Sequence, residues 1–283
     1  MKKFTKNMLI LAAFLFVTGL AITASAEALG GEMPGMVVLN NGWHGGDWFH
    51  DSHMSEIEAE ELADIDAVID EAGVKKLEIS VEAAGVEIME GDVKGSIYLA
   101  EAGNYIEWEQ EIDDDTLKLT IRKKRGKGNR ISSWDSEAYG AVLVLPGGKE
   151  FHEMKIKVGA GNVNADRITA NKLELEAGAG SISIDSGSVG ELKIDSQAGS
   201  VIFTGRVDRE LEADCQAGSA EVYLAGSQED FNYDLDVSIG NIEIDGRNYS
   251  GLDKKKAITN EDAWKKAKLN CEIGSVELVF YEE

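Results

Sequence analysis

The chain is 283 residues long, which is enough for one sizeable core or a single elongated domain. Its formal net charge of -24 argues against binding to nucleic acid through neutralised phosphates. It contains 31 glycines but only 2 prolines, which favours an ordered fold whose turns are made by glycine.

The first 26 residues predict a signal peptide. Three lysines precede the apolar run Met8–Ile22, and the small residues Ala24–Ala26 follow it, as signal peptidase cleavage requires. The mature chain is then expected to begin at Glu27. The alternative is an uncleaved membrane anchor, since the run approaches spanning length. In either case the rest of the chain is expected outside the cytoplasm, secreted or associated with the cell envelope, and it meets the membrane only through this segment.

Residues 27–70 form an acidic lead-in that also contains glycine, histidine and tryptophan. Imidazole and carboxylate groups suit Zn, Ni or Cu. The lead-in carries such groups at His44, Asp47, His50, Asp51 and His53. Their spacing matches no zinc motif, so we interpret the segment as a solvated tether.

A repeat organises the predicted domain, residues 71–283. Its markers are six glycines: Gly161, Gly180, Gly199, Gly218, Gly240 and Gly274. The first four are 19 residues apart, the fifth follows after 22 and the last after 34. Apolar residues recur seven, five, three and one positions before each glycine, and two and four positions after it. This alternation is typical of half-buried strands, and its parity changes at the glycine.

The repeat predicts an all-β fold. Each unit corresponds to two short strands and two glycine corners, and one unit cannot bury its apolar side alone. Stacked units bury a continuous core, as a period of about 20 residues indicates. We therefore predict a single-stranded β-helix, or β-solenoid. Its coils are expected to be right-handed, about 19–22 residues long and ~4.8 Å apart.

The two ends of the repeat region are less regular. Leu77–Ile88 copies the pattern of Leu173–Ile184, so the first coil is expected there. The insertion Arg247–Lys268 separates the last coil from its predecessor. We expect this insertion to cover the open end of the stack, whose backbone groups would otherwise be unpaired. The coils are expected to stack in chain order.

Several motifs carry a resemblance to a known family. They are VKKLEISVEAAGVEI, AVLVLP, the Ala-Gly-Ser/Asn-Val/Ile coils, and the ending NYSGL…KKAKLNCEIGSVELVF. Over about Val74–Phe280 the chain resembles the bacterial putative-adhesin domain of β-strand repeats, which is formally of unknown function. The resemblance implies a β-helix-like fold and an envelope location, and the family has no established catalytic residues to carry over.

The chain shows no sequence motif that predicts catalysis. It has no G-x-S-x-G, P-loop or Cys/His pair, and His152 stands alone beside a turn. We therefore predict an exported cell-envelope binding or display protein that is not an enzyme and needs no cofactor. Its expected partner is an envelope polymer or a surface protein. The alternatives are an envelope-stress partner of a membrane sensor, and a polysaccharide-active β-helix enzyme.

A basic segment follows one of the predicted strands. Its members are Arg122, Lys123, Lys124, Arg125, Lys127 and Arg130. These side chains could contact anionic wall polymer or lipid headgroups. Alternatively, they form a solvated turn that pairs with the domain's own acidic groups.

Carboxylates also recur on an outward column, four positions before the glycines. They are Glu176, Asp195, Asp214 and Asp236. Like charges on adjacent strands repel, and in chain order the end of this column has no cation nearby. A Ca²⁺ ion would relieve the repulsion there. The predicted ligands are Glu212, Asp214, Asp234 and Asp236. The alternative is a solvated acidic face screened by salt.

The two cysteines, Cys215 and Cys271, fall in the inward column three positions before their glycines. Val237 holds the same position in the coil between them. Two coil steps separate the Cα atoms by ~9.6 Å, which exceeds the ~7 Å limit for a disulfide. The sequence therefore predicts two buried free thiols.

Overall fold

The computed structural model describes residues 67–70, 73–91, 96–101, 106–123, 140–250 and 254–282. The chain divides into two units, and all the described residues belong to the second, Met54–Lys127 with Ser136–Glu283. The predicted signal peptide, the histidines of the lead-in and most of the basic segment lie outside the described residues. The predicted all-β class is confirmed, because the described part consists of strands and one short 3-10 turn.

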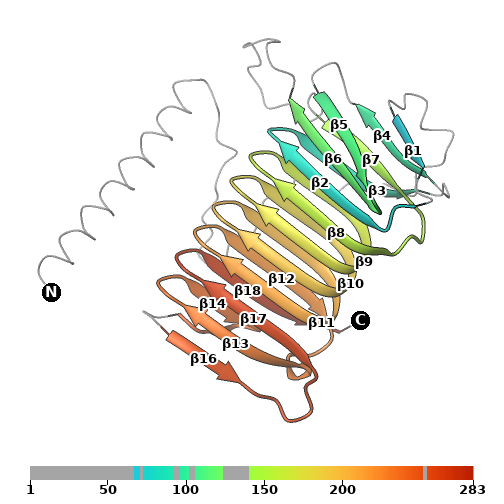
Figure 1. Ribbon diagram of the computed structural model, residues 1–283. Coiled ribbons are helices and arrows are strands. Elements are labelled where there is room, and N and C mark those ends of the chain that lie inside the picture. The colour runs from blue at the N-terminus through green and yellow to red at the C-terminus, as the bar shows by residue number, and fades with distance from the viewer. Residues whose placement is uncertain are drawn as a thin grey trace, which may run out of the picture. The chain divides into compact units, whose positions relative to one another are not determined.

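The strands follow one another along the chain and pair into one 18-stranded sheet system (Figure 1). In chain order the elements are β1 (Ala67–Asp70), β2 (Lys76–Glu82), β3 (Gly85–Gly91), β4 (Ser96–Glu101), β5 (Ile106–Asp113), β6 (Thr116–Lys123), β7 (Gly140–Pro146), β8 (Phe151–Val158), β9 (Asn162–Ala177), β10 (Ser181–Ser196), β11 (Ser200–Cys215), β12 (Ser219–Ala225), the 3-10 turn η2 (Gln228–Asp230), β13 (Phe231–Val237), β14 (Asn241–Ile244), β15 (Arg247–Asn248), β16 (Lys254–Ile258), β17 (Lys265–Cys271) and β18 (Ser275–Tyr281).

The centre of the domain is a stack of parallel strands, as a β-solenoid requires. In β10, Ser181 pairs with Asn162 on one side and with Ser200 on the other, so neighbouring repeats are offset by 19 residues. The backbone hydrogen bonds continue through the turns, where Ala179 N donates to Gly159 O and Ala198 N donates to Gly178 O, both at 2.8 Å. The right-handed sense of the coils stays a prediction.

The core consists of the predicted inward columns. Every residue seven, five or three positions before the glycines, and two or four after them, is buried, with at most 6% of its surface exposed. The column one position before the glycine was predicted wrongly. Ala179 and Ala198 are exposed, and so are Ile239 and Ile273, at 54% and 59%. The strand ends three residues before the glycine, so the alternation does not extend into the turn.

The turn glycines are required by close approach rather than by an unusual backbone angle. Gly199 does not adopt a positive φ, but a methyl group on its Cα would overlap the carbonyl oxygen of Gly180 in the coil beneath it. At the second corner the reason is different. Gly205, Gly226 and Gly246 have φ values of 150°, 120° and 73°, which side chains other than hydrogen disfavour.

The coils do not stack in chain order, and the prediction that they do is wrong. The last coil, β17 with β18, is inserted inside the stack. β17 pairs in parallel with β11 on one side and β13 on the other, and β18 lies in the same way between β12 and β14. In Figure 1 these dark red strands lie among the orange ones.

The N-terminal end of the domain repeats this arrangement. The first predicted coil, β2 with β3, is a coil of the stack, but it is not the outermost one. β2 lies between β6 and β8, and β3 lies between β7 and β9, in parallel register throughout. The first and last coils of the repeat region are therefore both interior coils.

Antiparallel strands close both ends of the parallel stack. At one end β5 pairs with β6, and β4 with β7; at the other, β16 pairs with β13, and β15 with β14. The prediction that the insertion covers the open end is confirmed, because β15 and β16 both belong to it. Reversing the strand direction ends the repeat, so a further parallel coil is not templated at either edge.

Among the described residues, the structure contains no helix with the length and hydrophobicity that a bilayer crossing requires.

Candidate binding surfaces

One outer face of the stack carries a column of alternating charge. Across nine neighbouring strands, from β5 to β13, each cation is flanked by anions. The column reads Glu111, Lys118, Glu78, Lys155, Glu174, Lys193, Glu212, Lys268 and Asp234. Lys155 Nζ lies 2.8 Å from Glu174 Oε1, and Lys268 forms an ion pair with Glu212. Each charge in this column therefore lies beside an opposite charge on the next strand, which favours the observed register.

The adjacent column contains three successive acidic residues, Glu176, Asp195 and Asp214, on β9, β10 and β11. Glu176 forms an ion pair with Lys155, and Asp214 accepts a hydrogen bond from Asn270 Nδ2. The Oδ1 atom of Asp195 is buried without a hydrogen-bond partner. Burial, then Glu176 and Asp214, raise the pKa of Asp195 above its usual value. This carboxylate is the least satisfied charge on the face.

We expect the variant Asp195→Asn to melt at a higher temperature than the parent near pH 7. An amide removes the repulsion, and it can donate to Glu176 or Asp214 as Asn270 does. The gain should be a few tenths to about 1 kcal/mol, as for other cross-strand charge pairs. Because the pKa of Asp195 is raised in the folded state, the contribution of this group to parent stability rises as the pH falls from neutral towards that pKa. The variant should lose part of that rise.

Thermal melts at several pH values check this expectation, with Asp262→Asn in the exposed turn before β17 as the control. An Asp195→Asn variant that melts at or below the parent temperature at neutral pH would show that the column carries no repulsion.

The structure separates the predicted calcium ligands. β17 lies between β11 and β13, so Lys268 stands between Glu212 and Asp234. Asn270 stands in the same way between Asp214 and Asp236, and Lys255 Nζ lies 2.6 Å from Asp236 Oδ2. In the described part of the chain, no group of three or more acidic, histidine or cysteine side chains could hold a metal ion. Calcium binding here remains a prediction, but the repulsion from which it was inferred is not present.

Only the beginning of the basic segment is described. Arg122 lies on β6, and its guanidinium contacts two carboxylates of β5, Glu107 at 2.7 Å and Glu109 at 2.6 Å. Lys123 is exposed at the end of the strand. The remaining members, Lys124, Arg125, Lys127 and Arg130, lie outside the described residues. At Arg122 the alternative is observed, in which the segment pairs with the domain's own acidic groups.

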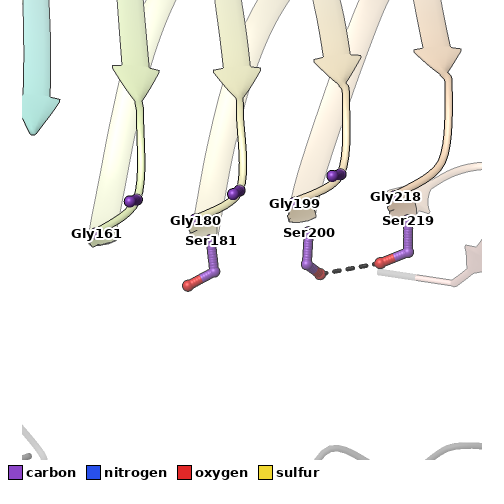
Figure 2. A pocket seen from close by; sticks show the side chains of 10 residues that line it. Gly161, Gly180, Ser181, Gly199, Ser200, Gly218 and Ser219 are labelled. Atoms are coloured by element: carbon purple, nitrogen blue, oxygen red, sulfur yellow. Dashed lines mark hydrogen bonds between the residues drawn. The ribbon is translucent and has the colours of Figure 1, made fainter. Parts of the chain in front are cut away.

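The turns on one side of the stack line an open groove of about 500 Å³ (Figure 2). Four coils contribute small residues from equivalent turn positions. The groove is lined by Ala160, Gly161, Ala179, Gly180, Ser181, Ala198, Gly199, Ser200, Gly218 and Ser219. Figure 2 shows the serine side chains pointing away from the ribbon, with Ser219 Oγ donating to Ser200 Oγ at 3.1 Å. The groove thus presents hydroxyl and methyl groups at the spacing of the coils.

The residues that directly follow the turn glycines form a column, the serine ladder, which extends beyond the groove on both sides. In register order it reads Asn162, Ser181, Ser200, Ser219, Ser275 and Asn241. The alanine column beside it ends in Ile273 and Ile239, which are neighbours because Ile239 N donates to Glu272 O at 2.7 Å. The sequence identified these residues as a corner, but it placed the alanines inside. A signal available in the sequence is that four successive coils keep alanine at this position, whereas the residues of the true core columns vary in size.

A second hollow, of about 410 Å³, lies beside the antiparallel strands at the C-terminal end of the stack. Tyr249, Arg247 and Lys256 are among the residues that line it, and Lys256 Nζ lies 4.7 Å from the centre of the Tyr249 ring. Sequence reasoning missed this hollow, because it depends on β16 folding back against β13.

Comparison with known proteins gives a family match and several distant structures, two of which are described below. Residues 74–207 match the family described as Toastrack DUF4097. A crystal structure described as a putative cell adhesion protein from Clostridium sporogenes is 16% identical, with a TM-score of 0.44 over 76% of this chain and 97% of that one. One described as a putative adhesin from Bacteroides fragilis is 11% identical, with a TM-score of 0.30 over 75% and 96%. No curated protein matches the chain. Residues 74–207 are therefore similar to the Toastrack family, and the resemblance inferred from the sequence is confirmed over these residues.

Proposed function

We propose that the protein is an exported cell-envelope binding protein that holds an envelope polymer, without catalysis, along the groove lined by its turns. The observation that supports this function is the repetition of the groove. Ser181, Ser200 and Ser219 present equivalent hydroxyl groups on three successive coils, about 4.8 Å apart. A polymer with repeating hydroxyl or amide groups could make the same contact at each step.

The electrostatics of the domain favour a polymer that is neutral or carries positive groups. The chain has a net charge of -24, and each cation of the alternating column lies beside anions on the neighbouring strands. The groove itself contains no charged side chain among its lining residues. Affinity would therefore come from many weak, equivalent contacts, as in other solenoids with extended binding surfaces.

We expect the full chain to bind a subset of neutral glycans or wall polymers on an array, and the variant Ala198→Trp to lose at least about tenfold in affinity. Ala198 is exposed in the groove, so an indole there blocks the path without disturbing the core. A tenfold loss corresponds to about 1.4 kcal/mol. The matched control is Ser188→Trp, at an exposed position outside the groove.

Equal binding by the two tryptophan variants would place the site elsewhere. An array on which the chain binds no envelope polymer at all would contradict the proposed function.

A further inference from the structure

The inserted coil brings the two cysteines together. Cys215 ends β11 and Cys271 ends β17, and the two residues are direct partners in the parallel register. Val237 lies on the far side of Cys271, not between the two cysteines. The expectation that two coil steps separate the thiols is therefore wrong, and the argument against a disulfide no longer applies.

The geometry of adjacent parallel strands suits a covalent link. Directly paired residues have Cα atoms ~4.8 Å apart, which lies within the range of about 4.4–6.8 Å found in disulfides. Both side chains point into the core, and each is only 1% exposed. Their Cβ atoms, also ~4.8 Å apart in an ideal ladder, would need to approach by a few tenths of an ångström.

The surroundings leave room for that approach. Glycines stand opposite both thiols. A methyl group on Gly274 would lie 2.7 Å from the sulfur of Cys215, and one on Gly240 would overlap the sulfur of Cys271. In the reduced chain the Cys215 thiol donates to Gly218 O at 2.9 Å. The equivalent position one coil earlier is Ser196, whose hydroxyl donates to Gly199 O at 2.8 Å. In other coils this position holds Ala177 or Val237, so the turn does not require the hydrogen bond that the Cys215 thiol makes.

The two thiols also differ in acidity. Cys271 and burial together raise the pKa of Cys215, whereas the neighbouring Cys215 thiol lowers the pKa of Cys271 against the opposing effect of burial. This difference holds in the folded domain, where the two thiols are neighbours. The form of either thiol that attacks a disulfide is the thiolate.

We propose that Cys215 and Cys271 form an intramolecular disulfide when the chain folds in the presence of an external disulfide. The thiolate of one cysteine attacks the external disulfide and releases one thiolate, which leaves a mixed disulfide on that cysteine. The other cysteine then attacks the sulfur of the first and releases the second thiolate. Two protein thiols are oxidised, the external disulfide is reduced to two thiols, and the two protons pass through water to the leaving groups. Because both sulfurs are buried in the folded domain, the exchange takes place before β17 is enclosed.

The bond would fasten the inserted coil to the strand that precedes it in the stack. It would close a chain loop from residue 215 to residue 271, which includes the end coil and its antiparallel strands. The chemistry rests on the export part of the proposed function for its oxidant, since cytoplasmic thiols are kept reduced. It does not rest on polymer binding.

The test is to fold the full denatured chain with mixed oxidised and reduced glutathione, and to alkylate it after a second denaturation without reductant. We expect no alkylated cysteine, a linked peptide containing both residues, and a melting temperature on the order of 10 °C above that of the reduced chain. A variant with both Ser196→Cys and Cys215→Ser is the matched control. Its two thiols lie two strands apart, ~9.6 Å, so both should be alkylated.

Two alkylated cysteines in the parent, or a disulfide-linked dimer, would overturn the proposal. A linked peptide in the control variant would also overturn it, because the link would then not depend on the register. If the parent forms the bond in vitro but is recovered reduced from cells, the export part of the proposed function fails while the cysteine pair stands.

Discussion

Deletion of residues 265–283 is expected to abolish the folded state rather than shorten the stack. These residues form β17 and β18, which lie between strand pairs on both sides. The deletion removes five buried side chains: Ala267, Leu269, Cys271, Val276 and Leu278. At about 1.5–3 kcal/mol for each larger side chain, the loss is on the order of 10 kcal/mol. That is comparable to the whole stability of a typical domain.

A larger internal deletion should be tolerated better. Removing residues 229–262 eliminates most of η2, the end coil and its antiparallel strands, but keeps the coil that is stacked on β11 and β12. The remaining connector between β12 and β17 has the same length as the natural one between β12 and β13. The last coil then follows its neighbour as an ordinary repeat.

Circular dichroism and thermal melts of both deletion variants test whether the last coil lies inside the stack. We expect cooperative unfolding for the internal deletion and none for the terminal one. A terminal deletion that unfolds cooperatively, with a melting temperature within a few degrees of the parent, would mean that the last coil is at the end of the stack as chain order suggested.

Substitution of Gly199 by alanine is a point mutation with a large expected effect on stability. The added methyl would overlap the Gly180 carbonyl oxygen, which belongs to the backbone and cannot rotate away. Two coils must therefore separate locally, and the turn hydrogen bonds between them lengthen, among them Ser200 N to Gly180 O at 3.0 Å. We expect a loss of about 3 kcal/mol, at the upper end of the usual cost of overpacking.

The matched control is Gly159→Ala, in the equivalent turn of an earlier coil. A methyl group there would meet only Val81 O, at 3.6 Å, which is an ordinary contact. Other coils carry Gln197 and Gln216 at the same turn position, so a side chain is accepted. Urea unfolding of both variants measures the difference, and similar midpoints would refute the close-approach explanation.

The core could be predicted from the sequence because period-two alternation depends only on neighbouring residues. Every column assigned to a strand was placed correctly, including Ser196, which holds a core position through its hydrogen bond to Gly199 O. The alanine column failed, because the same alternation was extended into a turn, where the chain direction changes within three residues.

The order of the coils could not be read from hydrophobicity, since every coil offers the same apolar columns to any neighbour. Charge distinguishes the two orders. In chain order, Glu212 would lie beside Asp234; in the structure Lys268 stands between them, as Glu78 stands between Lys118 and Lys155 at the other end. The signal was present in the sequence, but its use requires comparison of all possible neighbours.

The candidate surfaces were predictable only where they depend on the residues of a single coil. The corner residues were recognised from their repeat, whereas the separation of the calcium ligands and the meeting of the cysteines both followed from the inserted coil. The order in which the coils stack therefore cannot be predicted from the local sequence pattern of each coil.

The position of the terminal coils determines how the domain carries tension. In a stack built in chain order, a force on the C-terminus peels the outermost coil, one strand pair at a time. Here the force is applied to β17 and β18, which are held by neighbours on two sides and must slide out between them. On the N-terminal side, β1 pairs with β4 at the edge and can be peeled away, but β2 and β3, which follow it, are held between neighbours in the same way. A load transmitted through the chain thus shears two interfaces at once, so the fold resists extraction of its ends.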